Sequence, residues 1–350
     1  MVNKKIYNFF LKEYLFVITL LISILTIFFT KKIPQISIDD IKIIAILFML
    51  FASIKALENS AIIKAIAYKI EKGSLIASKL IIGTFFLSMF LTNDVALIAI
   101  VPLTLSLNIK NKASIVIFEA IAANAGSALT PFGNPQNLYI YIFYHLKFLE
   151  FFKIILPFAI FNFILLLVIS LFINPKQNIK REYKNKIFID EALLGAFALS
   201  VTILTIFHIL PLNISFWLVL VALILKPRSL KIDYFLLLTF LLFFAITNSL
   251  EPILANYIQK IRDIFLYSAI SSQIISNVPT ALLFAKFTSN YQALLWGVNV
   301  GGFGFIVGSL ANLIAYKLFT SSQKQKGFFI KFNAINIAFL LINIIFYYIL

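Results

Sequence analysis

The chain is 350 residues long; 61% of its residues are hydrophobic, only 13% are charged, and its formal net charge is +16. A soluble protein of this length cannot bury so much apolar surface, so the composition excludes a soluble protein and predicts a multi-pass membrane protein. The excess of lysine and arginine is typical of the inner loops of such proteins, and we do not expect nucleic-acid binding from it.

Apolar runs long enough to cross ~30 Å of hydrocarbon recur along the whole sequence. The first run is not followed by a small-residue cleavage site and is interpreted as a retained span. Two runs, 74–107 and 262–288, are interrupted by polar residues at mid-length and are interpreted as re-entrant hairpins. The other runs predict nine spans, which gives about 11 hydrophobic segments in all. These spans are 13–30, 40–58, 113–143, 151–173, 191–208, 211–226, 231–250, 291–318 and 328–350.

The longest polar stretch, Asn174–Asp190, is rich in basic residues, which places it in the cytoplasm. Its basic residues are Lys176, Lys180, Arg181, Lys184 and Lys186. Counting spans outward from this loop predicts a cell-membrane protein with its N-terminus in the cytoplasm and its C-terminus outside. About 20 Lys and Arg then lie on inner segments and about 7 on outer ones, as the positive-inside rule requires.

The two halves of the sequence resemble each other, which indicates an internal repeat. FASIKALE at 51–58 matches FAITNSLE at 244–251, and each is followed by a short amphipathic stretch, 60–72 and 252–261. In the long span that follows each hairpin, several residues of the first copy match residues of the second copy at one constant offset in number. These pairs are Asn124 with Asn299, Gly126 with Gly301, Gly133 with Gly308, Asn137 with Asn312, and Tyr141 with Tyr316.

Five crossings separate the two copies, so their orientations in the membrane are opposite. The sequence therefore predicts an all-α polytopic membrane protein made of two inverted repeats. The N-terminal repeat is 1–173 and the C-terminal repeat is 191–350, joined by the cytoplasmic loop 174–190. Inverted repeats with interrupted helices are typical of secondary transporters, whose substrate sites lie where the interruptions meet.

The interruptions themselves are polar: Thr92-Asn93-Asp94 in the first hairpin and Ser276–Thr280 in the second. Such a break exposes free N–H groups of one helix and free carbonyls of another, so it offers donors to an oxyanion and acceptors to a cation. Two later segments, GSALTPFGNPQN at 126–137 and GGFGFIVGSLAN at 301–312, contain too much glycine and proline for a continuous helix.

We expect the polar residues of these four segments to line the site. The candidates for substrate binding are Thr92, Asn93, Ser127, Thr130, Asn134, Asn137, Ser276, Asn277, Thr280, Asn299 and Asn312, with Gln136 and Ser309 as further lining residues. The candidates for the coupling ion are Asp94, Gly126 and Gly301. Asp94 stands out because an acid at mid-membrane is functional by default. Asparagines, serines and glycines have a simpler alternative role, which is to pack or bond neighbouring helices.

The hairpin segments FLSMFLTNDVALIAIVPLTL and SQIISNVPTALLF resemble the hairpin signatures of the ion transporter superfamily. That group includes arsenite–antimonite efflux permeases, citrate transporters, sodium/proton antiporters and divalent anion–sodium symporters. ANAGSALTPFGNPQN and NVGGFGFIVGSLAN resemble the unwound helices that follow, and the resemblance covers about residues 40–345. It implies a scaffold, a mobile transport domain and elevator-like alternating access. It also implies substrate contacts at Thr92, Asn93, Asn277 and Thr280.

Within the superfamily, the motifs look closest to the arsenite–antimonite efflux permeases. The hairpin tips of the anion symporters read Ser-Asn-Thr, whereas the first tip here ends in Asp94. An aspartate beside the pocket argues against a highly charged anion. We therefore expect a small oxyanion or its neutral acid, moved with coupling H⁺ or Na⁺. A citrate- or dicarboxylate-type anion symporter and a sodium/proton antiporter are the alternatives.

Other functional classes lack their sequence signatures. The chain has no cysteine, no H-E-x-x-H motif and only two histidines, so catalysis by an intramembrane enzyme and a metal site are not expected. It also has no G-x-x-x-x-G-K-[ST] loop, so we expect no ATP hydrolysis by this chain. A passive subunit of a membrane complex would leave the paired hairpins unexplained. The expected partners are the lipid bilayer and a small inorganic or organic anion, and the resemblance is compatible with a homodimer and with an ATPase subunit; we expect no resident cofactor.

Overall fold

A computed structural model describes residues 13–31, 36–70, 74–174, 186–258 and 262–350, and within them all regular structure is helical. This confirms the all-α membrane fold that the composition predicts. Four of the basic residues that placed the central loop in the cytoplasm, Lys176, Lys180, Arg181 and Lys184, lie outside the described residues.

The helices of the first half follow the predicted segments closely. They are α2 (Tyr14–Thr30), α3 (Ile38–Asn59), α4 (Ile62–Ile70), α5 (Ile76–Phe90), α6 (Asn93–Ser106), α7 (Lys112–Ser127), α8 (Pro135–Phe143) and α9 (Phe148–Phe172). Those of the second half are α10 (Ile189–Ile206), α11 (Leu212–Ile224), η1 (Pro227–Leu230), α12 (Tyr234–Ile258), α13 (Ile264–Ile275), α14 (Asn277–Ala285), α15 (Tyr291–Val300), η2 (Ile306–Gly308), α16 (Leu310–Ser322) and α17 (Phe328–Ile349).

Apolar side chains cover the outside of the molecule as well as its core. Phe29, Phe172 and Ile349 are 84%, 85% and 77% exposed, which would be costly in water and is natural against lipid. Among the described residues, four segments are long and apolar enough to cross a membrane. They are Phe148–Phe172, Ile189–Ile206, Pro227–Leu254 and Phe328–Ile349. The full set of nine spans stays a prediction.

The helices break where the sequence is polar or rich in glycine and proline. Two residues separate α5 from α6, and one residue, Ser276, separates α13 from α14. A longer irregular stretch, 128–134, lies between α7 and α8, and 301–309 lies between α15 and α16 with only the short η2 inside it. Pro135 opens α8 at a position where its missing N–H costs nothing.

One boundary differs from the sequence prediction. A span ending at residue 250 and a separate amphipathic stretch at 252–261 were expected, but α12 continues through Pro252 to Ile258. A proline removes one helical hydrogen bond, yet ending the helix in apolar surroundings would leave several backbone groups unpaired. The helix therefore continues past the proline.

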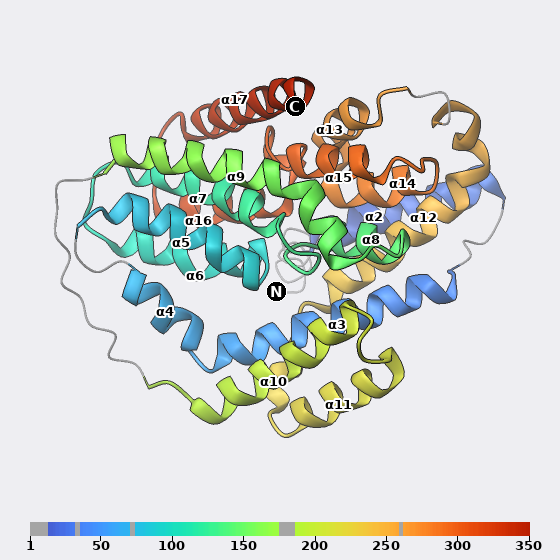
Figure 1. Ribbon diagram of the computed structural model, residues 1–350, viewed down its shortest axis with the longest axis horizontal. Coiled ribbons are helices and arrows are strands. Elements are labelled where there is room, and N and C mark those ends of the chain that lie inside the picture. Colours follow the sequence, from blue (N-terminus) through green and yellow to red (C-terminus); the bar gives the residue numbers. More distant parts are fainter. Residues whose placement is uncertain (1–12, 32–35, 71–73, 175–185, 259–261) are drawn as a thin grey trace, which may run out of the picture.

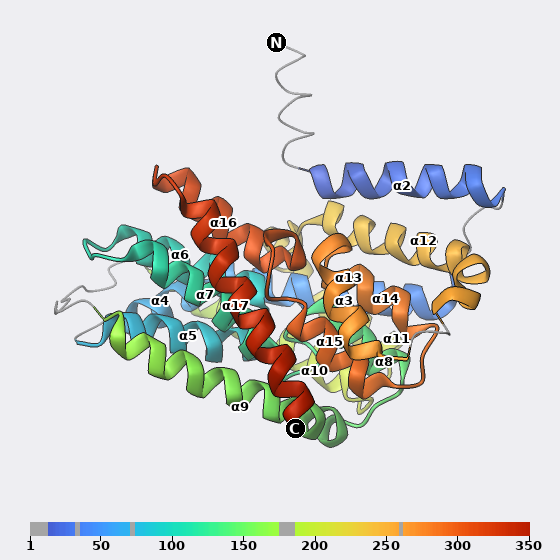
Figure 2. The same cartoon turned by 90° about the horizontal axis from the view of Figure 1, so that it is seen from above.

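The helices form two groups. One contains α2, α3, α10, α11 and α12: α3 packs on α10 and α11, and α2 runs beside α12 (Figures 1 and 2). In the other, α7 is central and packs against α5, α6, α9 and α16. The α13–α14 hairpin packs against α15, and α14 also contacts α8. This second group contains all the broken helices.

Candidate functional site

The tips of the two hairpins meet at one cavity of about 40 Å³, called here the tip cavity. Its polar lining residues come from both hairpins, from the start of α8, from α12 and from the stretch before α16. They are Asn93, Asp94, Gln136, Thr239, Ser276, Asn277 and Ser309. Within the described residues no lysine, arginine or histidine lines it, so its one ionisable group is the carboxyl of Asp94.

The first tip is shaped by the start of α6. Thr92 caps this helix: its backbone is extended and its Oγ1 accepts a hydrogen bond from the Val95 N–H at 3.4 Å. The backbone N–H of Asn93 donates to the carbonyl of Gly133 at 3.2 Å, which ties the tip to the stretch between α7 and α8. Asp94 follows in the first turn of α6, where the helix dipole favours a negative charge.

The second tip is a sharper turn. Ser276 alone joins α13 to α14. Its backbone angles, φ 73° and ψ 156°, are ones that residues other than glycine rarely adopt. Thr280 stabilises this turn, because its Oγ1 donates to the Ser276 carbonyl at 2.8 Å. This strained residue lies at the point where the two tips face each other.

Several groups facing the tip cavity have no hydrogen-bond partner in the described part of the chain. Asp94 Oδ1 is buried without one. Asn277 and Gln136 are each only 2% exposed, and no hydrogen bond of their side-chain amides is found among the described residues. Buried polar groups are nearly always paired, so the unpaired Asp94 Oδ1, beside two amides without a protein partner in the described chain, indicates a place for a ligand.

A network of hydrogen bonds behind the cavity is centred on Asn124 of α7. Its Oδ1 accepts from Asn93 Nδ2 at 3.3 Å and from Ser309 Oγ at 3.0 Å. Its Nδ2 donates to the Gly302 carbonyl at 3.2 Å and to Asn312 Oδ1 at 2.9 Å. Asn124 thus connects the first tip to the break between α15 and α16.

A second set of bonds runs the other way, from α15 to α8. Asn299 Nδ2 donates to Asn137 Oδ1 at 2.8 Å, and Asn137 Nδ2 donates to the Ala128 carbonyl at 3.1 Å. Asn134 caps α8 through the Asn137 N–H, and its Nδ2 donates to Ser127 Oγ at 3.1 Å. The side chains of these asparagines are therefore already engaged with other parts of the protein.

The remaining candidates lie away from the cavity. Thr130 Oγ1 donates to the Met89 carbonyl at 2.8 Å, which fixes the irregular stretch to the end of α5. Gly126 and Gly301 lie at helix contacts: a Cβ on Gly126 would be 2.0 Å from the Phe85 carbonyl oxygen, and one on Gly301 would be 2.5 Å from Ser272 Cβ. Ion coordination by these two glycines stays a prediction.

Of the sequence candidates, the structure brings Asn93, Asp94, Ser276 and Asn277 to one cavity. Sequence reasoning missed the central position of Asn124, although its repeat partner Asn299 was a candidate and symmetry alone could have suggested it. It also missed Gln273 of α13. The Gln273 Nε2 donates to the carbonyls of Gly301 at 2.8 Å and Phe303 at 3.0 Å, and a glutamine inside an apolar hairpin helix was a usable signal.

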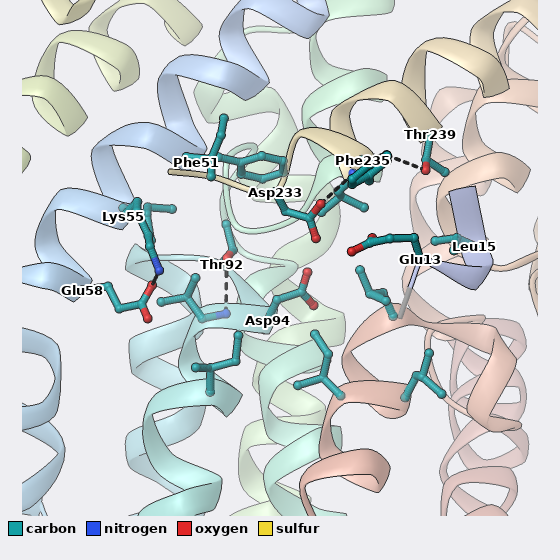
Figure 3. Close-up of a pocket in the computed structure, with 18 of the residues that line it drawn as sticks. Glu13, Leu15, Phe51, Lys55, Glu58, Thr92, Asp94, Asp233, Phe235 and Thr239 are labelled. Carbon is teal, nitrogen blue, oxygen red and sulfur yellow. Dashed lines mark hydrogen bonds and ion pairs between the residues drawn. The ribbon is translucent and has the colours of Figure 1, made fainter. Parts of the chain in front are cut away.

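A larger pocket of about 340 Å³, called here the entrance pocket, lies next to the tip cavity. The two share the lining residues Leu15, Asp94, Leu236, Thr239 and Leu310. In Figure 3 the carboxylates of Glu13, Asp94 and Asp233 turn toward the same space from three different segments. Lys55, Lys231 and Lys317 also line it, and Lys55 pairs with Glu58 at 2.9 Å. Asp94 therefore lies at the junction of both spaces.

Another pocket, of about 610 Å³ and called here the opposite pocket, lies at the other end of α3 and shares no described lining residue with the tip cavity. There Lys286, just after α14, is hydrogen-bonded to Asn248 of α12 and lies 3.4 Å from Glu251 Oε2. Asn248 Nδ2 in turn donates to Asp40 Oδ2 of α3 at 2.9 Å. The second hairpin is thus fastened to both helices on the side away from the entrance pocket.

Comparisons with known proteins agree with these features. A family model described as citrate transporter matches residues 13–294. An uncharacterized transporter of Methanocaldococcus jannaschii is 36% identical over 293 residues, which cover 79% of this chain and 80% of the relative. The inner membrane protein YbiR of Escherichia coli is 34% identical over 265 residues, or 69% of each chain. The prediction of a membrane transporter, and not an enzyme, is confirmed at the level of the family.

Proposed function

The chain belongs to the citrate transporter family, and from this premise we propose that it is an ion-coupled secondary transporter for a small oxyanion or its neutral acid. The substrate binds between the two hairpin tips, at Asn93 and Asn277, and Asp94 binds the coupling cation. Efflux of an arsenite- or antimonite-like acid is the form of this function that we favour.

The observation that carries the proposal is the chemistry of the tip cavity. It presents amides, hydroxyls and one carboxyl, and the described residues supply no cationic side chain to it. A multivalent anion beside Asp94 would face repulsion with no compensating charge, and in a low-dielectric setting that repulsion is strong. An uncharged hydroxy acid can instead exchange hydrogen bonds with the unpaired amides of Gln136 and Asn277.

The proposed inverted repeats are supported by paired contacts across the two halves. Asn124 matches Asn299 and Asn137 matches Asn312 in the sequence alignment, and the hydrogen bonds join Asn124 to Asn312 and Asn299 to Asn137. A pseudo-two-fold rotation would exchange these two bonds. The packing of α6 on α16 and of α14 on α8 follows the same exchange. We therefore propose that the repeats meet around the tip cavity.

The predicted alternation of membrane sides is supported by contacts between helix ends. Asn174 at the end of α9 accepts a hydrogen bond from the Ala77 N–H of α5 at 2.8 Å, and both ends are predicted to be cytoplasmic. Tyr291 of α15 donates to Glu150 of α9 at 2.7 Å, and both of these ends are predicted to be outside. By the same count the entrance pocket faces the cytoplasm, so the structure corresponds to an inward-facing state under this proposal.

A citrate-type symporter is the second candidate, because the family carries that name and three lysines line the entrance pocket. Uptake into vesicles containing the purified protein separates the two. Arsenite, antimonite, citrate, succinate and sulfate are offered in turn under imposed H⁺ or Na⁺ gradients, with protein-free vesicles as the control. We expect gradient-dependent movement of arsenite, which is uncharged at neutral pH. Transport of citrate or succinate without arsenite would replace our proposal with the second candidate.

A further inference from the structure

An apolar groove of about 750 Å³ runs between α4 and α5, outside the site described above. Apart from two lysines, its described lining residues are all apolar or glycine. They are Leu57, Ile62, Ile63, Ile66, Ile70, Ile82, Gly83, Phe86, Leu87, Phe90 and Leu91. Ile66, Phe86 and Phe90 are 44%, 46% and 59% exposed, so the groove is open to the surroundings of the protein along its length.

The two helices run in opposite directions and fix the polarity of this groove. Ile70 approaches Gly83 so closely that a Cβ there would lie 2.8 Å from Ile70 Cγ2. At the other end, Ile63 packs with Leu57 and Leu91. The groove therefore extends from the connection between α4 and α5 to the residue that precedes Thr92 at the first hairpin tip.

Both charged lining residues lie at one end of the groove. Lys69 is in the last turn of α4 and Lys79 is in the first turn of α5. From Lys79 to Phe90, α5 rises by about 16 Å at ~1.5 Å per residue. The groove thus combines a cationic end with an apolar channel about as long as a fatty-acyl chain.

We propose that this groove binds an anionic phospholipid, with the headgroup phosphate between Lys69 and Lys79 and one acyl chain extending toward Phe90 and Leu91. The charge at one end and the apolar lining beyond it match the two chemical parts of such a lipid. A partner helix would not need the cationic pair, and a free phosphate would not need the channel. The bound chain ends beside the first hairpin tip and contacts α5 along its whole length.

The test uses a single cysteine, which is possible because the chain contains none of its own. Phe90→Cys carries a thiol-linked fluorophore at the end of the groove, in nanodiscs of phosphatidylcholine with a trace of spin-labelled lipid. We expect phosphatidylglycerol labelled near the end of its chain to quench the fluorophore more strongly than labelled phosphatidylcholine. Lys69→Gln should reduce that preference about five-fold, and the double variant with Lys79→Gln should reduce it further.

Lys64→Gln is the matched control, because Lys64 lies on α4 and does not line the groove. It should leave the preference unchanged, and added glycerol phosphate, which has the headgroup charge without the chains, should not compete. Equal quenching by the two labelled lipids would overturn the proposal, and so would an unchanged preference in Lys69→Gln. Ile66→Trp fills the groove and provides an independent arm: persistence of strong quenching in this variant would also contradict the assignment.

Discussion

Two asparagines near the hairpin tips are almost equally buried but differ in how many hydrogen bonds their side chains form. Asn124 is 3% exposed and has four hydrogen bonds, whereas Asn277 is 2% exposed and its side chain has none within the described residues. A Cβ on the glycine between them, Gly302, would be 3.2 Å from Asn277 Nδ2 and 3.7 Å from Asn124 Cγ. We interpret Asn124 as holding the structure of the site and Asn277 as facing the ligand.

This contrast predicts different effects on stability. Asn124→Ala leaves Asn93, Ser309 and Asn312 short of a partner and should lower the free energy of unfolding by about 1–3 kcal/mol. Asn277→Ala removes no such bond, so it should lower the free energy of unfolding clearly less than Asn124→Ala does. Thermal unfolding in detergent measures both. Equal losses in the two variants would contradict the assignment of separate roles.

The carboxyl of Asp94 is the second single residue whose role can be tested. Asp94→Asn keeps the shape of the side chain but cannot take up or release a proton or balance a bound cation, so we expect it to uncouple transport from the gradient. The measurement compares net uptake under H⁺ and Na⁺ gradients with gradient-free substrate exchange. Exchange should persist while gradient-driven accumulation is lost. Accumulation equal to that of the unchanged protein would remove Asp94 from the coupling role.

At the scale of elements, the first helix of each hairpin packs closely against a broken helix at a glycine of that helix. Gly126 of α7 meets α5 at Phe85 and Ser88, and Gly301 just after α15 meets α13 at Ser272. Ser88 and Ser272 occupy matching positions, five residues before Asn93 and Asn277. The contacts differ in one respect: the closest atom to a new Cβ is a backbone carbonyl oxygen at 2.0 Å for Gly126 and side-chain atoms of Ser272 at 2.5 Å for Gly301.

That difference predicts unequal rescue of alanine substitutions. Gly126→Ala and Gly301→Ala should each destabilise the protein by about 1–3 kcal/mol, because the hairpin must move away from the helix beneath it. Adding Ser272→Gly to Gly301→Ala removes the overlapping atoms and should restore most of the stability. Adding Ser88→Gly to Gly126→Ala should restore little, since the Phe85 carbonyl remains. Equal rescue in both double variants would show that the glycines do not pack in this way.

The sequence was informative about elements wherever polarity interrupts an apolar run. The helices break at residues 91–92 and at Ser276, beside the polar residues as expected, while Asn93, Asp94 and Asn277 already belong to the first turns of α6 and α14. The end of α12 was predicted wrongly, since Pro252 looks like a terminator while membrane burial favours continuing the helix. The partners of the asparagines were beyond prediction: a sequence shows that Asn124 and Asn312 are polar, but which of them bond depends on how α7 and α16 pack.

At the scale of the whole molecule, the tip cavity adjoins a pocket on one side of the protein. It shares lining residues with the entrance pocket and none, within the described residues, with the opposite pocket. On the closed side the bonds from Lys286 to α12, continued through Asn248 to Asp40, join the second hairpin to helices of the other group. Alternating access requires that this connection breaks in a second, outward-facing state. Substrate and coupling ion can shift the equilibrium between the two states if they bind them with different affinities.

Removing the Lys286–Asn248 hydrogen bond should make the tip cavity accessible from the side of the opposite pocket. In a Ser276→Cys variant, a membrane-impermeant thiol reagent should react from the side of the entrance pocket only. Adding Lys286→Ala should allow reaction from both sides, at a rate several-fold above that of the single variant. Lys42→Ala, which changes another lysine of the opposite pocket, is the control and should have no such effect. Unchanged protection in Lys286→Ala would mean that other contacts close this side.

The central claim is that substrate passes between the two hairpin tips. Initial rates of substrate exchange in reconstituted vesicles test it most directly, with Asn93→Ala and Asn277→Ala compared with the unchanged protein at equal amounts of inserted protein. We expect exchange to fall to the level of protein-free vesicles in both variants, while Lys64→Gln, far from the cavity, retains the full rate. Full exchange in both asparagine variants would contradict the claim.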